Sequence, residues 1–403
     1  MVITVIGIDL GSNNLRIVAS KLESEKDDKF EIIGRSYTQK HISSTNAGNI
    51  VNIEKVKTHL KAIVEEVELM TGREIVKAFV GISSNLIKGF EVATSTPIQG
   101  KHKTVTEEDV NRAIENAKQI NLPKEFTSLH IIPYRFIVDN QGIFDNPIGA
   151  KGSRLSLEAF SIVCPKIVIN NILSVCNNIG ITVAKTIFEP LAGAETAILP
   201  NERDAGVLFI DIGYETTQNI IVKGNGVKHL FIQPFASKHI TSDLMEVLNI
   251  SQEDAERLKK EVDLQDKNLE SQLDEGVEVK VAGTGTKKIV RKSLIAEVVW
   301  ARLYEIFQDI KNDLIQKNME TSFPAGVVIA GGGAKIPNIE ILAKEVFKIN
   351  ARVAIPSKIA GLTEDIVDPS WVTAVGLLQF GYRYFPEECI LKRGLFSRLF
   401  KKK

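Results

Sequence analysis

Two hairpins of the same design, about two hundred residues apart, constrain this sequence more than any other feature. The second hairpin, residues 207–223, reads VLFIDIGYETTQNIIVK: an apolar run that ends at Asp211, a break at Gly213 and a second apolar run. The first, residues 3–20, reads ITVIGIDLGSNNLRIVAS and repeats this order around Asp9. Apolar runs on either side of a glycine turn predict a strand, a tight turn and a strand. Two copies indicate a chain with two similar halves.

The turns of both hairpins have the residue types that bind a polyphosphate. Glycine lets the backbone approach an anion, hydroxyls and N–H groups donate to phosphate oxygens, and a carboxylate at a strand end can hold hydrated Mg²⁺. Either hairpin alone could equally be an ordinary turn. As a pair they predict a nucleotide clamp, in which Asp9 and Asp211 hold Mg²⁺ through water. The candidate binding residues are Asp9, Gly11, Ser12, Asn13, Asn14, Asp211, Gly213, Thr216 and Thr217.

A third glycine-rich motif follows later in the chain. Residues 326–336, GVVIAGGGAKI, contain an apolar run that predicts a buried strand ending in three glycines. Residues 338–347 then have the spacing of a helix. A helix that starts beside glycines points N–H dipoles at a ligand and lets it approach the backbone. The candidate binding residues in this motif are Gly331, Gly332, Gly333 and Lys335.

The composition limits the class of protein. A length of 403 residues exceeds one comfortable hydrophobic core, so two or more domains are expected. Charges are balanced, with 50 Lys and Arg against 50 Asp and Glu, so bulk charge does not favour nucleic acid. No apolar run has the length of a membrane span, and a signal peptide is not expected. Three cysteines without metal-binding spacing (Cys164, Cys176 and Cys389) indicate buried thiols in a reducing cytoplasm.

An insert is predicted to begin at Ser83, where the composition changes. Thr106, with Asp109 three residues later, marks the start of a helix. Residues 129–139 and 157–163 then predict two strands. The whole is a strand–helix–strand–strand unit of about eighty residues, which is large enough for a subdomain.

The rest of the chain predicts alternating helices and strands. Residues 263–278 are highly charged and indicate solvated surface. The predicted strands are residues 30–36, 76–82, 182–188 and 228–234. The predicted helices are residues 53–71, 168–179 and 293–316, a segment of small residues that follows Glu189, and a polar region at 237–262.

The order of these motifs resembles that of the actin, sugar-kinase and heat-shock-chaperone ATPase superfamily. Its two phosphate loops, connecting helix and adenosine motif are similar to IGIDLGSNN, IDIGYETTQNI, EPLAGAETAIL and VVIAGGGAKIPNIEIL. Within it the chain looks like the FtsA family of bacterial division actins, over essentially its whole length. The insert segments VTEEDVNRAIENAK, LHIIPYRFIVD and NPIGAKGSRL are similar to the 1C insert of that family, and DPSWVTAVGLLQFG resembles its last stretch before the tail.

The resemblance implies an α/β chain with a two-lobed actin-like ATPase fold, an inserted small α+β subdomain of the SHS2 type and a C-terminal amphipathic helix. It also implies a division into subdomains. These are lobe 1 (1A) at 1–83, 164–196 and 361–385; the 1C insert at 84–163; lobe 2 (2A) at 197–236 and 300–360; the 2B subdomain at 237–299; and a linker with a membrane-targeting helix at 386–403.

The resemblance also extends the list of site residues. Glu189 occupies the position of a water-orienting residue that could act as a base, and Glu256 and Lys259 match a helix that contacts the adenosine in relatives. The chain departs from the pattern at Tyr214 and Glu215, which replace two glycines, and at Asn14, which replaces a lysine. A carboxylate near a polyphosphate is repulsive unless a metal or a turned-away rotamer relieves it. Very slow or absent ATP hydrolysis is therefore expected.

The last residues, ILKRGLFSRLFKKK, predict a short amphipathic cationic helix. It is too short to span a bilayer but suits the bilayer interface, where one copy would bind weakly and a cluster strongly. Packing on the protein itself is the alternative. The candidate membrane residues are Leu391, Lys392, Arg393, Leu395, Phe396, Arg398, Leu399, Phe400 and Lys401.

The family resemblance implies an ATP- and Mg²⁺-binding, self-associating protein at the division septum. It would tether the ring of the tubulin-like protein FtsZ to the cytoplasmic face of the plasma membrane and help to recruit further division proteins. The partners would be the FtsZ C-terminal peptide, bound on the lobe that contains residues 237–300, other copies of the chain and anionic lipids, with no role for nucleic acid. The alternatives are an adaptor of type IV pilus assembly similar to PilM and a soluble small-molecule kinase.

Overall fold

The computed structural model describes residues 3–22, 30–38, 44–119, 121–268, 275–319, 322–356 and 359–389. A five-stranded sheet forms the base of the first half, with the strand order β11-β6-β1-β2-β3. β1 and β2 are the first predicted hairpin; β3 extends them antiparallel, and β6 and β11 add parallel strands on the other side. The bounds are β1 (Ile3–Leu10), β2 (Leu15–Leu22), β3 (Phe30–Tyr37), β6 (Lys77–Ile82) and β11 (Thr182–Phe188).

A second five-stranded sheet repeats this plan with the order β14-β13-β12-β17-β18. Its first three strands are antiparallel and its last two are parallel to β12, as in the first sheet. The predicted duplication of the hairpin therefore extends to a whole sheet. The bounds are β12 (Val207–Ile212), β13 (Thr217–Lys223), β14 (Gly226–Gln233), β17 (Val327–Ala330) and β18 (Ala351–Val353).

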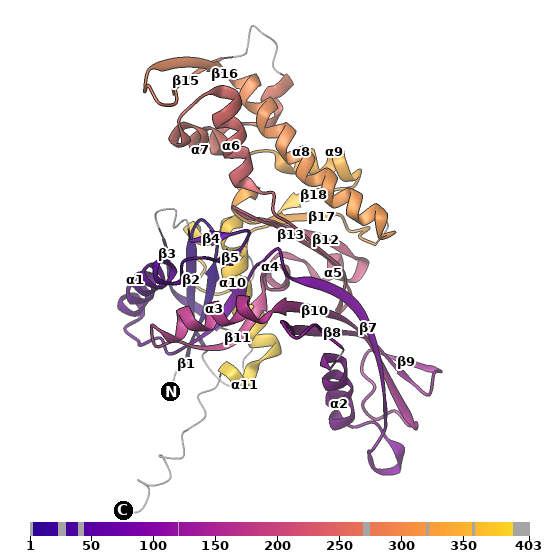
Figure 1. Ribbon diagram of the computed structural model, residues 1–403. Coiled ribbons are helices and arrows are strands. Elements are labelled where there is room, and N and C mark those ends of the chain that lie inside the picture. Colours follow the sequence, from indigo (N-terminus) through magenta and orange to yellow (C-terminus); the bar gives the residue numbers. More distant parts are fainter. Residues whose placement is uncertain are drawn as a thin grey trace, which may run out of the picture.

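Two helices occupy the middle of the molecule between the sheets (Figure 1). α4 (Glu189–Ala197) packs along α10 (Val372–Tyr384), and α10 also contacts β1 and β6. On the other face of the first sheet lie α1 (Ile53–Thr71) and α3 (Lys166–Asn177). The apolar residues of β1 divide accordingly: Ile6 and Ile8 pack with the α1 side, and Val5 packs with α10. This alternation follows from the period of two in a strand.

The insert forms a separate four-stranded antiparallel sheet with the order β7-β10-β8-β9, covered by one helix (Figure 1). The helix begins where predicted, because the Thr106 and Asp109 side chains each accept a hydrogen bond from the other's backbone N–H. β9 is a short strand that the sequence did not predict. The bounds are β7 (Lys88–Pro97), α2 (Glu107–Lys118), β8 (Phe126–Val138), β9 (Gly142–Phe144) and β10 (Arg154–Pro165).

Four helices and a hairpin pack on the outer face of the second sheet and above it. The interpretation of 263–278 as solvated surface is wrong in part: the side chain of Leu264 is fully buried, and residues 276–280 pair with a second strand. The elements are α6 (Ser237–Leu248), α7 (Gln252–Glu261), β15 (Gly276–Lys280), β16 (Lys287–Arg291), α8 (Lys292–Gln316) and α9 (Ile339–Phe347).

The described chain ends in α11 (Pro386–Cys389), which follows α10 directly. Its Glu388 forms an ion pair with Lys77 of β6 at 2.6 Å, and Phe385 stacks on Phe79. The predicted amphipathic tail and its candidate membrane residues lie outside the described residues. Among the residues that are described, no helix is both long and apolar enough to cross a bilayer.

Candidate functional site

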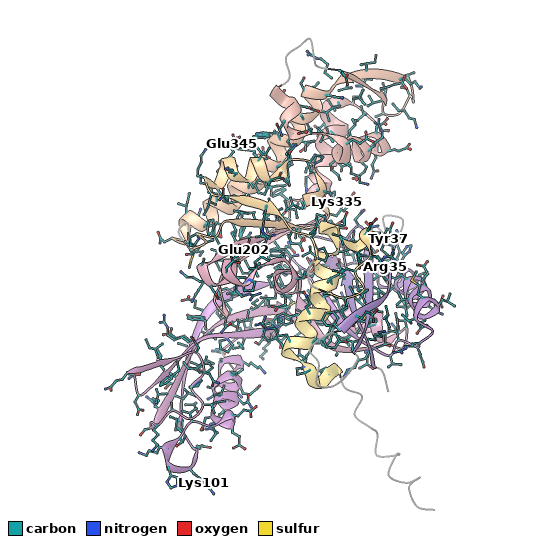
Figure 2. The ribbon with its side chains drawn as sticks, turned by 180° about the vertical axis from the view of Figure 1, so that it is seen from behind. Arg35, Tyr37, Lys101, Glu202, Lys335 and Glu345 are labelled. Atoms are coloured by element: carbon teal, nitrogen blue, oxygen red, sulfur yellow. The ribbon has the colours of Figure 1, made fainter. Side chains whose placement is uncertain are left out.

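A cleft of about 650 Å³ opens where the two sheets face each other. Figure 2 shows Lys335 and Tyr37 on its two sides, one in each half of the molecule. Segments that are far apart in the sequence meet there. Of the predicted site residues, the cleft is lined by Asp9, Gly11, Ser12, Asn13, Asn14, Glu189, Asp211, Gly213, Thr216, Glu256, Lys259, Gly331, Gly332, Gly333 and Lys335.

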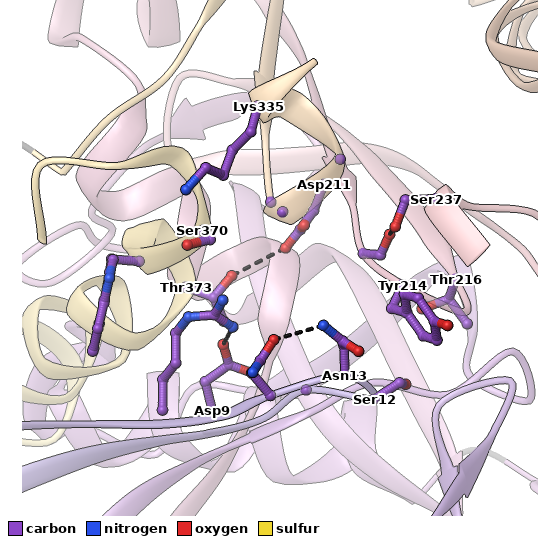
Figure 3. A pocket seen from close by; sticks show the side chains of 18 of the residues that line it. Asp9, Ser12, Asn13, Asp211, Tyr214, Thr216, Ser237, Lys335, Ser370 and Thr373 are labelled. Carbon is purple, nitrogen blue, oxygen red and sulfur yellow. Dashed lines mark hydrogen bonds and ion pairs between the residues drawn. The ribbon is translucent and has the colours of Figure 1, made fainter. Parts of the chain in front are cut away.

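Asp9 and Asp211 reach the cleft from equivalent positions near the ends of β1 and β12 (Figure 3). Gly7, two residues before Asp9, faces α10, and Phe209, two residues before Asp211, faces Gly193 of α4. Because side chains alternate along a strand, both aspartates point toward the space between the sheets where these central helices lie. The fold thus aims one carboxylate from each half at the same cavity.

These carboxyl groups are buried close to one another, and this alters their acidity. Burial, with a further contribution from Asp211, raises the pKa of Asp9 to about 6, although Arg16 acts to lower it. Burial also raises the pKa of Asp211, against the hydrogen bond from Thr373. Removing charge from water disfavours the ionised form, and neighbouring acids add to the effect. A cation in the cleft would favour ionisation of these groups.

Glu189 lies at the first position of α4 and is also buried. Burial first, and then Asp9 and Asp211, raise its pKa well above the ordinary value. Its Oε2 accepts a hydrogen bond from Gln218 Nε2 at 3.4 Å, and the same amide donates to Ser83 Oγ at 2.7 Å. Glu189 Oε1 is buried without a hydrogen-bond partner among the described atoms. A buried, unsatisfied oxygen beside a cavity is a position where water or ligand can bind.

The three glycines after β17 allow close approach of the chain to Asp211. Gly331 has φ of 88°, and a Cβ there would lie 2.2 Å from Asp211 Oδ1. A Cβ on Gly332, in contrast, would meet nothing within 4 Å. Gly331 is therefore required by the protein itself, whereas the backbone at Gly332 is open to a ligand in the cleft.

Tyr214 and Glu215 are the two unusual residues of the second hairpin, and their side chains point in different directions. The ring of Tyr214 lines the cleft and lies 5.7 Å from Lys259 Nζ. Glu215 is not among the lining residues; it is buried, and its Oε1 pairs with Lys238 Nζ at 3.5 Å. The predicted repulsion between Glu215 and a polyphosphate is thus relieved by a side chain that is turned away.

Two lysines that line the cleft are already paired with acids. Lys259 Nζ contacts Glu256 Oε1 at 2.9 Å, and burial lowers the pKa of this lysine. Lys335 Nζ contacts Asp368 Oδ2 at 2.5 Å. Asp368 also accepts hydrogen bonds from the Ser370 backbone N–H and hydroxyl, at 2.9 and 2.6 Å. These ion pairs hold both lysine side chains in place.

Thr217 is placed differently from the prediction. Its side chain is fully buried outside the cleft, and its hydroxyl donates to the carbonyl of Phe235 at 2.7 Å. Thr216 and Thr217 are neighbours at the start of a strand, so only one of the two can face the cavity. The sequence alone did not show which of the two threonines faces the cleft.

Several lining residues were missed by the sequence analysis. Arg16 and Gln218 lie directly opposite Asp9 and Asp211 across the hairpins. Strand alternation beyond the turn could have identified both of them. Trp371 and Thr373 belong to DPSWVTAVGLLQFG, where the sequence carries no sign of a site because only the folded chain brings this segment to the cleft. The other missed residues are Leu10, Tyr37, Ser83, Tyr214, Ser237, Gln252, Lys260, Ile336, Asp365, Asp368 and Ser370.

Comparison with known proteins identifies the family. The model described as "Cell division protein FtsA" matches residues 208–376, and "SHS2 domain inserted in FTSA" matches residues 85–163. Cell division protein FtsA of Borreliella burgdorferi is 30% identical over 377 residues, covering 93% of this chain and 90% of the relative. This chain belongs to the FtsA family. FtsA of Bacillus subtilis is also 30% identical, over 378 residues that cover 94% of this chain and 83% of the relative. Because its relatives are FtsA cell division proteins, this chain is an actin-like division protein.

Solved structures support the fold independently of sequence. The PilM–PilN type IV pilus biogenesis complex superposes with a TM-score of 0.64 at 15% identity, covering 94% of this chain and 98% of that chain. MreB5 of Spiroplasma citri bound to ADP gives a TM-score of 0.54 at 15% identity, with coverage of 94% and 96%. The predicted two-lobed actin-like fold with a small insert is confirmed. At such identities the likeness concerns the fold alone, so it lends no support to a pilus adaptor or a kinase.

Proposed function

We propose that this FtsA-family chain binds ATP with Mg²⁺ in the cleft between its two sheets. The observation that carries the proposal is the pair of equivalent hairpins that aim Asp9 and Asp211 at one cavity. The open backbone at Gly332 fits a closely approaching phosphate or ribose. MreB5, which shares the fold, was solved with ADP.

The donor set fits a hydrated Mg²⁺ ion bound together with phosphate. Among the described residues, no group of three or more His, Cys, Asp or Glu could hold a metal ion. Mg²⁺ keeps several waters and commonly binds through one or two carboxylates plus substrate phosphates. Asp9 and Asp211 would hold those waters, and the ion would favour their ionised forms. The protein would thus bind metal and nucleotide together.

Hydrolysis of the bound nucleotide would be very slow. Glu189 is the candidate that could orient and deprotonate the attacking water. Burial and the two neighbouring aspartates raise the pKa of Glu189 well above its ordinary value, which favours the protonated carboxyl, and a protonated carboxyl cannot act as a base. Ionisation in the presence of a bound cation would restore some basicity. Nucleotide would therefore serve mainly to hold the two halves together.

At the level of the cell, we infer that the chain tethers the FtsZ ring to the cytoplasmic face of the plasma membrane at the division septum. Membership of the FtsA family supports this function. Self-association through the actin-like fold would multiply weak tail contacts into stable attachment. The filament-forming MamK shares the fold, with a TM-score of 0.53. The lobe that contains residues 237–300 would bind the FtsZ C-terminal peptide, and further division proteins would join the assembly.

Flotation with anionic liposomes tests the membrane part of this proposal. The intact chain is compared with a chain truncated after Cys389, which keeps α11 and its Lys77–Glu388 ion pair intact. A double variant, Leu395→Asp with Leu399→Asp, keeps every cation and removes apolar area. We expect only the intact chain to float, and to float better with ATP and Mg²⁺. If the intact chain stays in solution, or all three float alike, the tethering proposal fails.

A further inference from the structure

The insert contributes no described residue to the lining of the cleft, but its strand β8 contacts both five-stranded sheets. β8 lies against β11 of the first sheet and β14 of the second. β11 is an edge strand of the first sheet and leads directly into α4, whose first residue is Glu189. The insert is thus packed against the segment that carries the candidate water-orienting carboxyl.

A histidine of β8 makes a specific contact with this segment. His130 Nε2 accepts a hydrogen bond of 3.0 Å from the backbone N–H of Phe188, the last residue of β11. An edge strand leaves the N–H groups of its outer side without a partner in the sheet, and a buried N–H needs an acceptor. Phe188 is fully buried, so His130 supplies an acceptor where bulk water does not reach.

The imidazole of His130 has the protonation state that this contact needs. Burial lowers the pKa of His130 to about 4, so the ring is neutral near pH 7. A backbone N–H can only donate, so Nε2 is the unprotonated nitrogen and Nδ1 carries the ring proton. The ring of Phe380 on α10 makes a T-shaped contact with the imidazole, with 6.0 Å between the ring centroids. His130 therefore presents a fixed acceptor at the junction of β11 and α4.

This junction determines where the side chain of Glu189 lies. Phe188 is the N-cap residue of α4, and its apolar side chain makes no capping hydrogen bond. Glu189 follows it with a buried carboxyl, whose Oε1 has no hydrogen-bond partner among the described atoms. A shift of the Phe188 peptide would move this carboxyl relative to the water that it would orient. A misplacement of about 1 Å can cost about 100-fold in rate.

We propose that His130 is a positioning residue for Glu189, which acts from the insert through the Phe188 N–H to keep that carboxyl aligned in the nucleotide cleft. This rests on the proposed ATP site and deepens it, because it gives the insert a part in the slow hydrolysis. His130 does not line the cleft, so it affects the rate of hydrolysis and not the affinity for ATP. A histidine that only supported the fold would change both.

Single-turnover hydrolysis of ATP with Mg²⁺, with the intact chain in excess, tests the proposal beside calorimetric titration of ATP. His130→Phe keeps a ring without the acceptor, so the rate should fall about 10-fold while the ATP affinity changes by less than about twofold. His130→Gln should keep the rate within about threefold, because its amide oxygen lies as many bonds from Cβ as Nε2 does and can accept the same hydrogen bond. His130→Asn, whose oxygen lies one bond closer to Cβ, should lose rate as His130→Phe does.

Two controls separate this role from a general effect on the fold. Tyr134→Phe removes a polar group from the same strand and should leave the rate unchanged. In the Glu189→Gln background, His130→Phe should cause no further loss of rate, because both residues act through one carboxyl. Thermal unfolding shows whether each variant is folded, and His130→Asn carries the test if His130→Phe is not.

An unchanged rate in both His130→Phe and His130→Asn would overturn the proposal. So would an equal loss in His130→Gln, a parallel loss of ATP affinity or a further loss in the Glu189→Gln background, each of which would leave His130 as a packing residue. An intact chain that binds ATP without any hydrolysis would also overturn it, since Glu189 would then orient no water. An intact chain that binds no ATP would overturn the proposed function itself, and this inference with it.

Discussion

Thr373 Oγ1 donates a hydrogen bond of 3.0 Å to Asp211 Oδ2 (Figure 3). The hydroxyl belongs to α10, which packs on the first sheet, and the carboxylate belongs to β12 of the second. A buried contact therefore joins the two halves of the molecule beside the cleft. It also lowers the pKa of Asp211 against the opposite effect of burial.

Thr373→Val removes this donor while keeping a similar volume. The loss of a hydrogen bond to a buried carboxyl should cost about 1–3 kcal/mol in the free energy of unfolding. It should also weaken binding of ATP with Mg²⁺, because Asp211 becomes harder to ionise. Thr217→Val is a matched control, since its hydroxyl bonds to Phe235 outside the cleft. Urea unfolding and nucleotide titration should show both variants less stable and only Thr373→Val impaired in binding.

The acidity of Asp9 predicts a dependence of stability on pH. Its pKa rises from 3.8 to about 6 on folding, so the associated stability is fully present below about pH 4 and lost as the pH rises through 6. Asp9→Asn avoids that loss. Without nucleotide, the free energy of unfolding of the variant should exceed that of the intact chain by up to about 3 kcal/mol at pH 7.5. At pH 4 the carboxyl of Asp9 should contribute little to the difference between the two.

Guanidinium unfolding at both pH values provides this measurement. Nucleotide binding by Asp9→Asn should fall at the same time, because an amide holds the hydrated metal ion poorly. A variant that is no more stable than the intact chain at pH 7.5 would show that folding does not raise the pKa of Asp9.

Gly331 and Gly332 should respond in opposite ways to the same substitution. Gly331→Ala places a Cβ 2.2 Å from Asp211 Oδ1 at a left-handed backbone position, which should destabilise the fold by about 2 kcal/mol or more. Gly332→Ala meets nothing in the protein and should leave stability unchanged while weakening nucleotide binding. Thermal unfolding with nucleotide titration distinguishes them. Normal ATP affinity in Gly332→Ala would mean that the ligand does not approach this backbone.

Hydrolysis of ATP should proceed far more slowly than about one turnover per second, a common enzyme rate. Glu189→Gln should reduce it further without changing ATP affinity more than about twofold, because the substitution removes a base and keeps the volume. Phosphate release measured under steady-state conditions checks both expectations. A rate near one per second in the intact chain would show that Glu189 ionises readily once metal and nucleotide are bound.

The capping interaction of α2 predicts a stability effect confined to the insert. Burial would raise the pKa of Asp109, but hydrogen bonds from Gln99, Thr106 and Arg112 lower it to about 2. Its stabilisation is therefore present above about pH 4 and lost as the pH falls through 2. Asp109→Asn should lower the free energy of unfolding by about 2 kcal/mol at pH 7.

Hydrogen exchange in residues 107–118 should show this loss. Glu115→Gln, an exposed carboxylate on the same helix, should leave exchange unchanged. Equal protection from hydrogen exchange in both variants would mean that the hydrogen bonds between Thr106 and Asp109 do not limit opening of the insert.

The parts of the fold that the sequence predicted correctly are those with strong local patterns. Both hairpins, the helix at 53–71, the helix start at Thr106 and the strand before the three glycines have periodicity or capping residues that act over a few positions. β9, with three residues, is too short to show alternation, and the β15–β16 hairpin is charged on its exposed face. The boundaries of the four subdomains stay a prediction.

The candidate site was predictable where its residues lie within the turns. Arg16 and Gln218 are the second residues of the strands that follow the turns, so their place in the cleft depends on strand alternation and register. Trp371 and Thr373 lie more than a hundred residues from either hairpin and reach the cleft only through packing of α10. Contacts of such long range leave no local pattern in the sequence.

The packing of α10 on β1 and β6 also has a consequence for synthesis of the protein. The first sheet is translated early, but one of its faces is completed by residues 372–384. Val5 and Phe79 remain without the apolar side chains of α10 until almost the whole chain has left the ribosome. The half of the molecule that is made first is thus finished last, and a chain that stops short of residue 372 exposes an apolar surface that chaperones and proteases recognise.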